Sequence, residues 1–575
     1  MNQNLLKNNN YANIQSIGRA SGPSLSLLIN ELSNHTDGTL IVIAENSNHA
    51  NQLKHEIDFF KEQDTKVDLF PEWETLPYDN FSPQKDIVSE RIKILSDQSG
   101  LKNKIKIITP YSLLNRLPPK DYIFNNSLSL KIGQNLKYEQ LLKILIEKGY
   151  SKVNQVEEYT EFSSRGSLID IFPMGFPSPA RIEIYDDKIE SIKIFDPNTQ
   201  ISFKNIEEIK IIAPREYPLD ANSIEVFRGK FRELFEGQPS KSKIYRDISS
   251  GISAGGAEYF LPLFFESTIN FLDYFSDKSK IILPSNLSNL LEELWNEIIE
   301  RFEYSCSSNH QQFLSPDKAF FDYKNLLKKL KSYNNISYTQ KSLTPNERNI
   351  NLDVKSVPSL MINVLHKEPS KELLRFISNF KGKILFTAES IGKREELADF
   401  LKNLDIKIRS VNSWNDFLSL DIEITSTVAP FRESVILINQ NTAIISSDQI
   451  FTKKPRQQKK ILRERDPELI IKQLTDLSIG SPVVHIVYGI GRFQGLINLK
   501  FGEDNEEFLH LEYADKDKLY VPVHSLDLIS RYTGSSPENA PLHKLGSDQW
   551  SRVKTNAIKK IRDVNGRLEL IKKYP

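Results

Sequence analysis

Residues that bind phosphate are the first chemistry to seek in this chain of 575 residues. The phosphate-binding loop GxxxxGK[ST] surrounds phosphates with backbone N–H groups and a lysine. The chain does not contain this motif. Gly382-Lys383 and Gly392-Lys393 lack the Ser or Thr that holds magnesium, and residues 16–28, SIGRASGPSLSLL, have glycines but no lysine. We therefore predict no ATP site, no cofactor and no enzymatic activity in this chain.

Acidic and histidine side chains that could hold a metal ion are the second chemistry. Asp186 and Asp187 are neighbours on a predicted strand, so they point to opposite faces and cannot bind one ion together. Three histidines lie in predicted strands without metal-site spacing: His485, His510 and His524. Cys306 is the single cysteine, which excludes an intrachain disulfide and a cysteine-based zinc site. The sequence predicts no catalytic residue and no metal site.

Residues 161–202 carry the strongest sign of protein binding. Arg165, Arg181 and Tyr185 alternate there with apolar residues that we expect in the core: Leu168, Ile171, Ile182 and Ile184. Arginine and tyrosine on a sheet face are typical of binding hot spots. An ordinary solvated sheet face is the alternative interpretation.

The elements that must position these residues predict a multidomain α/β protein. Residues 16–120 alternate helices at 24–32 and 49–60 with buried strands at 39–44 and 104–110, which favours a parallel sheet. An α+β insert follows, with a helix near 140–148. The expected domains are 16–120, 121–212 (strands 153–159, 167–172, 180–186 and 189–195), 213–345 (mostly helical), a linker at 345–358, and 359–451 (a second small α/β domain).

The last hundred residues read as a compact β module joined to a helix. Residues 475–545 alternate apolar and polar side chains at period two between glycines, which is typical of short twisted strands. Residues 546–575 have apolar residues at helical spacing after Ser547, a possible N-cap. The run 452–465 within the linker 452–474 is strongly basic, and we interpret it as an exposed linker, with contact to DNA or polymerase as the alternative.

Composition bounds the remaining classes. Lys and Arg together number 75, as do Asp and Glu, so the net charge is zero and predicts no general affinity for nucleic acid. The first ten residues lack an apolar core, so we expect no secretory signal. The longest apolar stretch, near residues 259–265, is far shorter than the ~18 residues of a membrane helix. We expect a cytoplasmic protein without membrane contact.

Three segments resemble one known family. Residues 482–571, with LYVPV at 519–523 and ISRY at 529–532, resemble the RNA-polymerase-interacting module of bacterial transcription-repair coupling factors (Mfd), which is shared with CarD-type regulators. Residues 76–95, LPYDNFSPQKDIVSERIKIL, resemble the first domain of the same family and of the helicase UvrB, without UvrB's DNA-clamping hairpin. Residues 161–202 resemble the UvrB-homologous domain that binds UvrA.

The resemblance implies specific contacts. In the family, the arginine of EF-x-x-RG, the arginine of P-x-R and the aromatic residue before DD bind UvrA, which here are Arg165, Arg181 and Tyr185. The terminal module, of SH3/Tudor-like fold, implies docking on the RNA polymerase β subunit through a strand edge. Leu499 matches an apolar residue of that docking, with Ile497 and Lys500 beside it.

The resemblance covers nearly the whole chain and implies the N-terminal half of a coupling factor. Longer members continue into a translocase that uses ATP and Mg²⁺ and acts on double-stranded DNA. This chain is then expected to be a non-enzymatic adaptor for transcription-coupled nucleotide excision repair, with a degenerate nucleotide-binding-like first domain. The alternatives are an ATP-driven motor and a CarD-like transcription regulator without a repair role.

Overall fold

The computed structural model describes residues 14–62, 64–79, 81–97, 104–276, 278–309, 312–362, 370–451, 480–485, 488–501, 504–522, 529–531 and 542–544. Residues 1–453 form one compact unit and residues 454–575 a second. The described parts are mixed α/β with several separate sheets, as predicted. The predicted basic linker (452–474) and the closing helix (546–575) lie outside the described residues.

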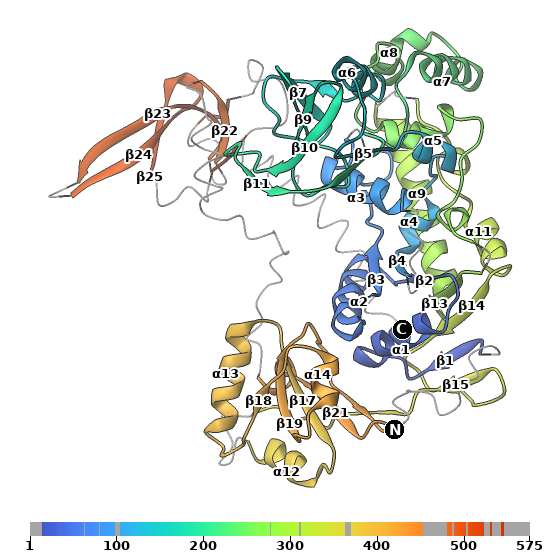
Figure 1. Ribbon diagram of the computed structural model, residues 1–575, viewed down its shortest axis with the longest axis vertical. Coiled ribbons are helices and arrows are strands. Elements are labelled where there is room, and N and C mark those ends of the chain that lie inside the picture. The colour runs from blue at the N-terminus through green and yellow to red at the C-terminus, as the bar shows by residue number, and fades with distance from the viewer. Residues whose placement is uncertain are drawn as a thin grey trace. The chain divides into compact units, whose positions relative to one another are not determined.

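A seven-stranded parallel sheet organises the first part of the first unit (Figure 1). Its strands, in spatial order, are β15 (Asn349–Asn351), β1 (Ser16–Gly18), β14 (Asn334–Tyr338), β13 (Lys280–Pro284), β2 (Thr39–Ile43), β4 (Lys104–Ile108) and β3 (Lys66–Leu69). The predicted buried strands at 39–44 and 104–110 are confirmed as β2 and β4. Both faces are apolar because a parallel sheet is covered on both sides.

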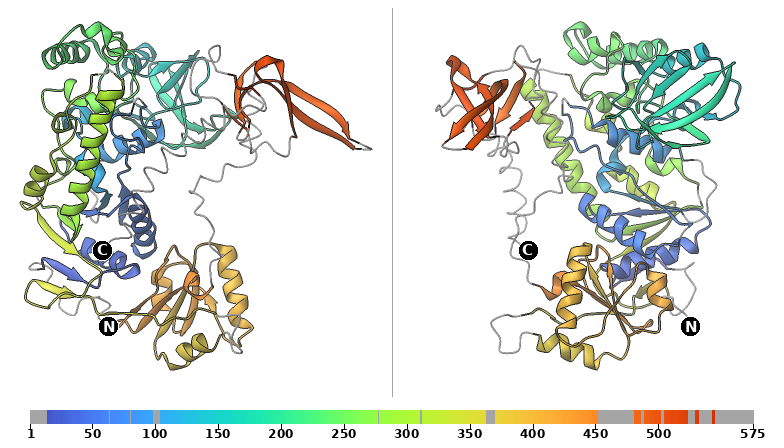
Figure 2. Two further views of the ribbon diagram at one scale, coloured as in Figure 1. Left: turned by 180° about the vertical axis from the view of Figure 1, so that it is seen from behind. Right: turned by 60° about the vertical axis from the view of Figure 1, so that its left-hand side comes forward.

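Helices cover the two faces of this sheet. Leu40 and Val42 pack in one core with α1 (Pro23–Asn34) and α2 (Ser47–Phe60), whereas Ile41 and Ile43 pack in another. That second core includes the long helix α9, which runs beside the sheet in Figure 2. The helices that contribute to this second core are α3 (Lys85–Leu95), α4 (Pro110–Leu114), α5 (Lys120–Asn125), α7 (Ala221–Leu234), α8 (Lys243–Ser249), η2 (Ala257–Leu263), η3 (Phe271–Tyr274), α9 (Leu287–Asn309), α10 (Pro316–Ala319) and α11 (Tyr323–Leu330). A further short helix, η1 (Pro239–Lys241), lies just before α8 and has no buried residue.

Residues 213–345 differ from the helical expectation in one respect. They also supply β13 and β14, which lie in the centre of the parallel sheet between β1 and β2. The expected linker at 345–358 likewise supplies β15 and β16 (Val354–Ser356). β15 and β16 have only three residues each, which is too short to show a period, and β14 (NNISY) is mostly polar. β13 (KIILP) is as long as β2 and is likewise mostly buried, but it was not recognised from the sequence.

The insert is a six-stranded sheet with one helix on its core face. The order is β11 (Ser202–Asn205), β10 (Lys188–Phe195), β9 (Ala180–Tyr185), β8 (Leu168–Ile171), β7 (Glu161–Arg165) and β6 (Ser151–Lys152), with α6 (Tyr138–Glu147) packed against it. A separate pair, β5 (Leu128–Lys131) and β12 (Glu208–Ile211), joins the insert to the rest. The strands expected at 167–172, 180–186 and 189–195 are confirmed.

The strand expected at 153–159 is wrong. Residues 153–160 form a loop, and the next strand, β7, begins at Glu161. Val153, Val156 and Tyr159 pack into a small core with two phenylalanines, Phe172 and Phe195. Their spacing of three, rather than two, explains why no strand forms.

The second small α/β domain is also present. Its sheet has the order β16, β20 (Val435–Leu437), β21 (Thr442–Ser446), β17 (Lys383–Ala388), β19 (Ile424–Val428) and β18 (Arg409–Ser410). Its helices are α12 (Lys371–Asn379), α13 (Ile391–Lys402), α14 (Trp414–Ser419) and α15 (Ser447–Ile450). Trp414 and Phe431 of this domain pack on Phe60 of α2, with ring centroids 5.0 and 5.2 Å from it. The two α/β domains therefore share one hydrophobic core.

The second unit contains one antiparallel sheet among its described residues. The order is β25 (Lys518–Pro522), β24 (Asp504–Glu512), β23 (Gly489–Phe501), β22 (Pro482–His485) and β26 (Ile529–Arg531), with a short helix η4 (Ala514–Lys516) before β25. Gly495 marks a bulge in β23 and has a φ of 124°, which a side chain would strain. The predicted β module is confirmed as a small twisted sheet.

Candidate protein-binding face

The strand register brings Arg165, Arg181 and Tyr185 onto one face of the insert's sheet. Arg165 on β7 lies opposite Leu168 on β8, which in turn lies opposite Glu183 on β9. Arg181 and Tyr185 flank Glu183 at two-residue spacing and so share its face. At ~4.8 Å between strands, Arg165 lies about 10 Å from the line of the other two. The opposite face is the core, where Ile169, Ile171, Ile182 and Ile184 are buried.

Leu168 was expected in the core, and that expectation is wrong. Because side chains alternate along a strand, Leu168 shares a face with Asp170 while Ile169 and Ile171 fill the core. Leu168 is half-buried beside Arg165. It therefore adds apolar area to the face that carries the two arginines.

Tyr185 is held at the end of a tight hairpin. Asp186 and Asp187 form the two-residue turn between β9 and β10, with φ values of 50° and 58°. Positive φ at both positions is the type I′ geometry that matches the twist of paired strands. The tyrosine ring is 72% exposed, and the two aspartates are turn residues. Within the described residues, no three acidic, histidine or cysteine side chains are grouped to hold a metal ion.

Arg181 is bound within the chain. Its Nε and Nη2 donate to the two carboxylate oxygens of Asp170 at 2.8 and 2.9 Å. Its guanidinium carbon lies 4.9 Å from the ring centre of Phe195. These hydrogen bonds to Asp170 raise the pKa of Arg181. Because the side chain is only 25% exposed, Arg181 presents part of one edge to a partner and also organises the sheet.

Arg165 is exposed and is held by a loop. Its Nη2 donates to the backbone oxygen of Asn154 at 2.7 Å. The same loop is tied to α3 by an ion pair between Lys85 and Glu158 at 2.8 Å. Gln200 donates to the backbone oxygen of Val156 at 3.1 Å and fixes the loop from the other side. The guanidinium is thus positioned while most of its donors face solvent.

The residues proposed for polymerase docking lie on β23. Ile497 pairs with Phe508, Leu499 with Glu506 and Lys500 with Asn505, all on β24. On β23, the strand β22 reaches only residues 489–492, so in the described residues the outer half of β23 is paired on one side, by β24. Ile497 is half-buried, whereas the side chains of Leu499 and Lys500 lie outside the described part. A strand with one unpaired edge can accept a strand from another chain.

The histidines of the second unit are structural where they are described. His485 is buried, and its Nδ1 accepts a hydrogen bond from the backbone N–H of Tyr488 at 3.3 Å. Burial lowers the pKa of His485, which favours the neutral ring. His510 lies on β24 with its ring 5.2 Å from that of Tyr520. His524 lies outside the described residues.

The position where a phosphate loop would lie is occupied by a carboxylate. Gly22, with a φ of 47°, precedes α1, and no lysine lies in the loop from β1 to α1. A Cβ placed on Gly22 would lie 2.8 Å from the Glu433 Oε2 atom of the second α/β domain. A negative charge at a helix N-terminus is favourable, and here the charge is that of the Glu433 side chain rather than that of a bound phosphate. The carboxylate of Glu433 therefore lies beside the backbone at the start of α1.

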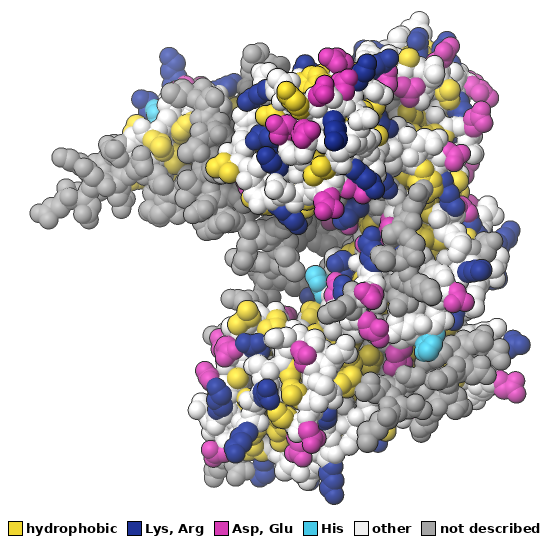
Figure 3. All heavy atoms as spheres, in the orientation of Figure 1, with side chains coloured by type: hydrophobic (Ala, Val, Ile, Leu, Met, Phe, Trp, Pro, Cys, Tyr) yellow, Lys and Arg dark blue, Asp and Glu magenta, His cyan; other side chains and the backbone are white. Residues whose placement is uncertain are grey.

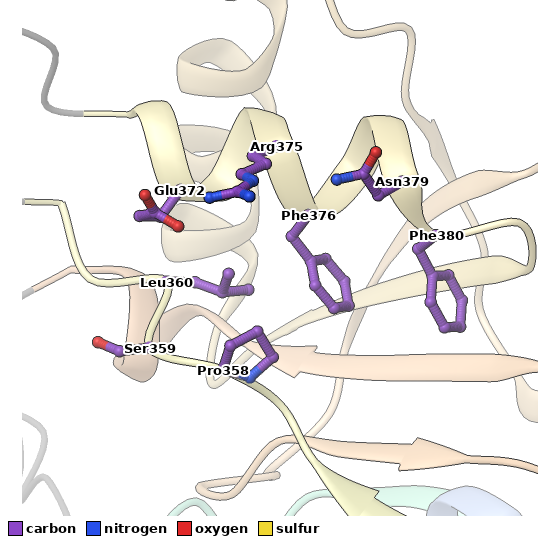
Figure 4. A pocket seen from close by; sticks show the side chains of 8 residues that line it. All are labelled: Pro358, Ser359, Leu360, Glu372, Arg375, Phe376, Asn379 and Phe380. Atoms are coloured by element: carbon purple, nitrogen blue, oxygen red, sulfur yellow. The ribbon is translucent and has the colours of Figure 1, made fainter.

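A groove of about 330 Å³ lies on the second α/β domain, between α12 and residues 358–360 (Figure 4). Phe376 and Phe380 point from α12 into it and stack with ring centroids 5.4 Å apart. Glu372 and Arg375 are its charged residues, and the rest of its lining is apolar or neutral. The groove brings together no pair of groups for acid–base or nucleophilic chemistry.

Two residues of the sheet face were not predicted from the sequence. Asp170 binds Arg181. The sequence carried a sign of this pair, because Asp170 stands between two isoleucines and a buried aspartate needs a cationic partner. Phe203 on β11 is 64% exposed, and it too faces away from the core. Figure 3 shows apolar side chains among basic and acidic ones over this part of the molecule.

Comparison with known proteins gives a match for the insert, the second α/β domain and the β module. Residues 128–217 match the UvrB interaction domain, residues 376–450 the MFD D3 domain, and residues 477–533 the CarD-like/TRCF RID domain. The chain is 36% identical over 547 residues to the transcription-repair-coupling factor of Haemophilus influenzae and 33% identical over 554 residues to that of Escherichia coli. The alignments cover 94% and 96% of this chain.

Over nearly its whole length the chain is similar to transcription-repair-coupling factors. It spans about half the length of the curated relatives it matches, 47% and 48% of the two proteins named above. The relative from Bacillus subtilis is 26% identical over 587 residues, with 97% of this chain and 48% of that protein covered. The sheet with Arg165, Arg181 and Tyr185 lies in the segment that matches the UvrB interaction domain. The β23 strand lies in the segment that matches the CarD-like domain.

Proposed function

We propose that this chain acts in transcription-coupled nucleotide excision repair as a docking protein with two partners. The insert's sheet binds UvrA, and the β module of the second unit binds RNA polymerase through its β subunit. The observation that carries the proposal is that Arg165, Arg181 and Tyr185 converge on one sheet face in the segment matching the UvrB interaction domain.

The first domain serves as a scaffold without nucleotide in this proposal. It has the parallel sheet of a nucleotide-binding domain, but the loop before α1 lacks a lysine and faces Glu433. ATP, Mg²⁺ and most double-stranded DNA contact belong to the translocase of longer family members. The β module has an SH3/Tudor-like fold and acts in the cytoplasm. Among the described residues, no helix has the length and apolar character needed to cross a membrane.

Calorimetric titration of UvrA tests the repair partner. Arg165→Ala and Tyr185→Ala should each weaken binding by roughly 1–3 kcal/mol, about 5- to 150-fold, because exposed arginine and aromatic side chains dominate interface energies. Polymerase binding by the same variants is the control and should not change. Wild-type chain that binds polymerase but not UvrA would instead support the CarD-like regulator.

An ATPase assay tests the absence of catalysis. The chain should not hydrolyse ATP with or without DNA, because phosphoryl transfer needs a lysine and a metal-bound Ser or Thr around the phosphates. ATP hydrolysis that is stimulated by DNA and stays with the chain through purification would contradict the docking-only role and favour a motor.

A further inference from the structure

The three predicted residues are too few to make a stable interface. A specific protein interface buries about 800 Å² on each partner, a patch about 30 Å across, with an apolar centre. Arg181 forms an ion pair with Asp170, so the exposed side chains that remain for a partner are those of Arg165 and Tyr185. The face therefore needs further apolar area beside Tyr185.

Phe203 supplies apolar area on the same face. Ile206, two residues from Lys204, packs on the core, so Lys204 faces the core side and the outer face takes Phe203 and Asn205. Asn205 pairs with Lys193, which pairs with Arg181 on the next strand. The β10–β11 pairing has a bulge between Ile194 and Phe195, and Phe203 lies at this bulge on the facing strand. The ring is 64% exposed, and Ile201 beside it is 67% exposed.

The strand that carries Phe203 is an edge strand. Among the described residues β11 pairs only with β10, so its other edge has unpaired backbone groups. Single exposed apolar residues are common on protein surfaces, but proteins usually protect edge strands with charges or short length. Two large apolar side chains within three residues at an edge indicate a surface that a partner covers.

We propose that the docking face extends across β11 and that Phe203 is its second apolar anchor. From β7 to β11 is four strand spacings, about 19 Å, which fits one standard interface. Lys193 lies between Arg181 and Phe203 and makes no ion pair among the described residues. The partner thus presents a pocket for the Phe203 ring and acidic groups toward Arg165 and Lys193. This inference rests on the proposed function, and its partner is the same UvrA.

The test is UvrA titration of the chain with Phe203→Thr and Phe203→Leu. We expect at least about a tenfold loss of affinity for Phe203→Thr and recovery to within about threefold for Phe203→Leu, which keeps an apolar side chain. Threonine is a good residue for an exposed strand, so the fold should persist. Phe203→Lys is measured in parallel, because lysine is common on edge strands and gives a second polar variant.

The matched control is Ile146→Ser. Ile146 is 58% exposed on α6, whose Leu141 and Leu145 pack against the core face of the sheet, so it lies away from the proposed surface. Its variant should bind within about twofold of wild type. Phe203 variants that bind like wild type, while Tyr185→Ala does not, overturn the extension and leave the proposed function intact. Wild-type chain without affinity for UvrA overturns both.

Discussion

At the scale of single residues, the three proposed contacts differ in kind. Tyr185 is exposed beside a tight turn, and Arg165 is exposed at the end of β7 with a hydrogen bond to a loop, so both are available to a partner. Arg181 is committed to Asp170 and Phe195. A substitution of Arg181 would therefore change both the proposed binding face and the stability of the sheet.

Arg181→Ala should destabilise the insert, whereas Arg165→Ala should not. Removal of the guanidinium leaves the carboxylate of Asp170, 11% exposed, without its bidentate partner, which costs about 1–3 kcal/mol. Hydrogen exchange of β8 and β9 measures the local free energy of opening. Asp170→Asn in the Arg181→Ala background is the control and should restore part of the loss. Equal exchange in both arginine variants would show that the pair does not stabilise the sheet.

The sequence was sufficient to place these residues on one face but not to define their partners. Period-two alternation along β9 separates Arg181 and Tyr185 from Ile182 and Ile184, which needs no knowledge of register. The pairing of Asp170 with Arg181 depends on the offset between β8 and β9, which local patterns do not encode. Leu168 was assigned to the wrong face for a different reason: it lies three residues from Ile171 on one strand, and alternation at period two puts the two on opposite faces.

At the scale of elements, a buried glutamate links α1, α2 and the second α/β domain. Glu56 is 1% exposed on α2, and it accepts hydrogen bonds from Ser26 Oγ at 2.5 Å and Gln52 Nε2 at 2.8 Å. Burial raises the pKa of Glu56 to about 7, although the hydrogen bonds from Ser26 and Gln52 act to lower it. Glu433 and Arg432 of the second α/β domain make smaller contributions of opposite sign. The side chain is therefore largely protonated below neutral pH.

Glu56→Gln should make the chain more stable at pH 8 than wild type, with a smaller gain at pH 5. A folded pKa above the unfolded value means that the folded state holds the proton, so stability falls as pH rises from about 4.5 to 7 and stays low above it. The neutral amide removes that loss, which is at most about 3 kcal/mol. Thermal unfolding at both pH values measures it. An equal effect at the two pH values would show that Glu56 does not titrate in this window.

The helices and two buried strands of the first domain were predicted, whereas other strands of its sheet were not. The helices at 24–32 and 49–60 have enough residues to show a period, the strands at 39–44 and 104–110 are buried apolar runs, and each is present within a few residues of its expected bounds. β1, β13, β14 and β15 have three to five residues and gain their stability from sheet neighbours far away in sequence. Tertiary pairing of that kind leaves little trace in local sequence.

At the scale of the whole molecule, the two proposed docking surfaces lie in separate compact units, residues 1–453 and 454–575. The family match could be predicted from motifs such as LYVPV and ISRY, because those residues occur together in one module. The core shared by the two α/β domains could not, since Phe60 and Trp414 are more than three hundred residues apart.

The two binding activities should therefore be separable. Tyr185→Ala should lose UvrA and keep RNA polymerase, whereas Leu499→Arg should do the reverse, because it places a charge on the strand proposed to pair with polymerase. Calorimetry of each variant with each partner measures the four affinities. A variant that lost both partners, with its circular dichroism unchanged, would contradict independent docking.

The short ladder of β5 and β12 brings the two ends of the insert together. Leu128 lies opposite Ile211, so the polypeptide enters and leaves the insert at points about 5 Å apart. A tight turn between residues 127 and 212 could close the host domain without disturbing its parallel sheet. The insert is thus connected as a cassette whose two chain ends lie together, and Met174 of the insert, which packs in the host core, is one of the contacts that its removal would lose.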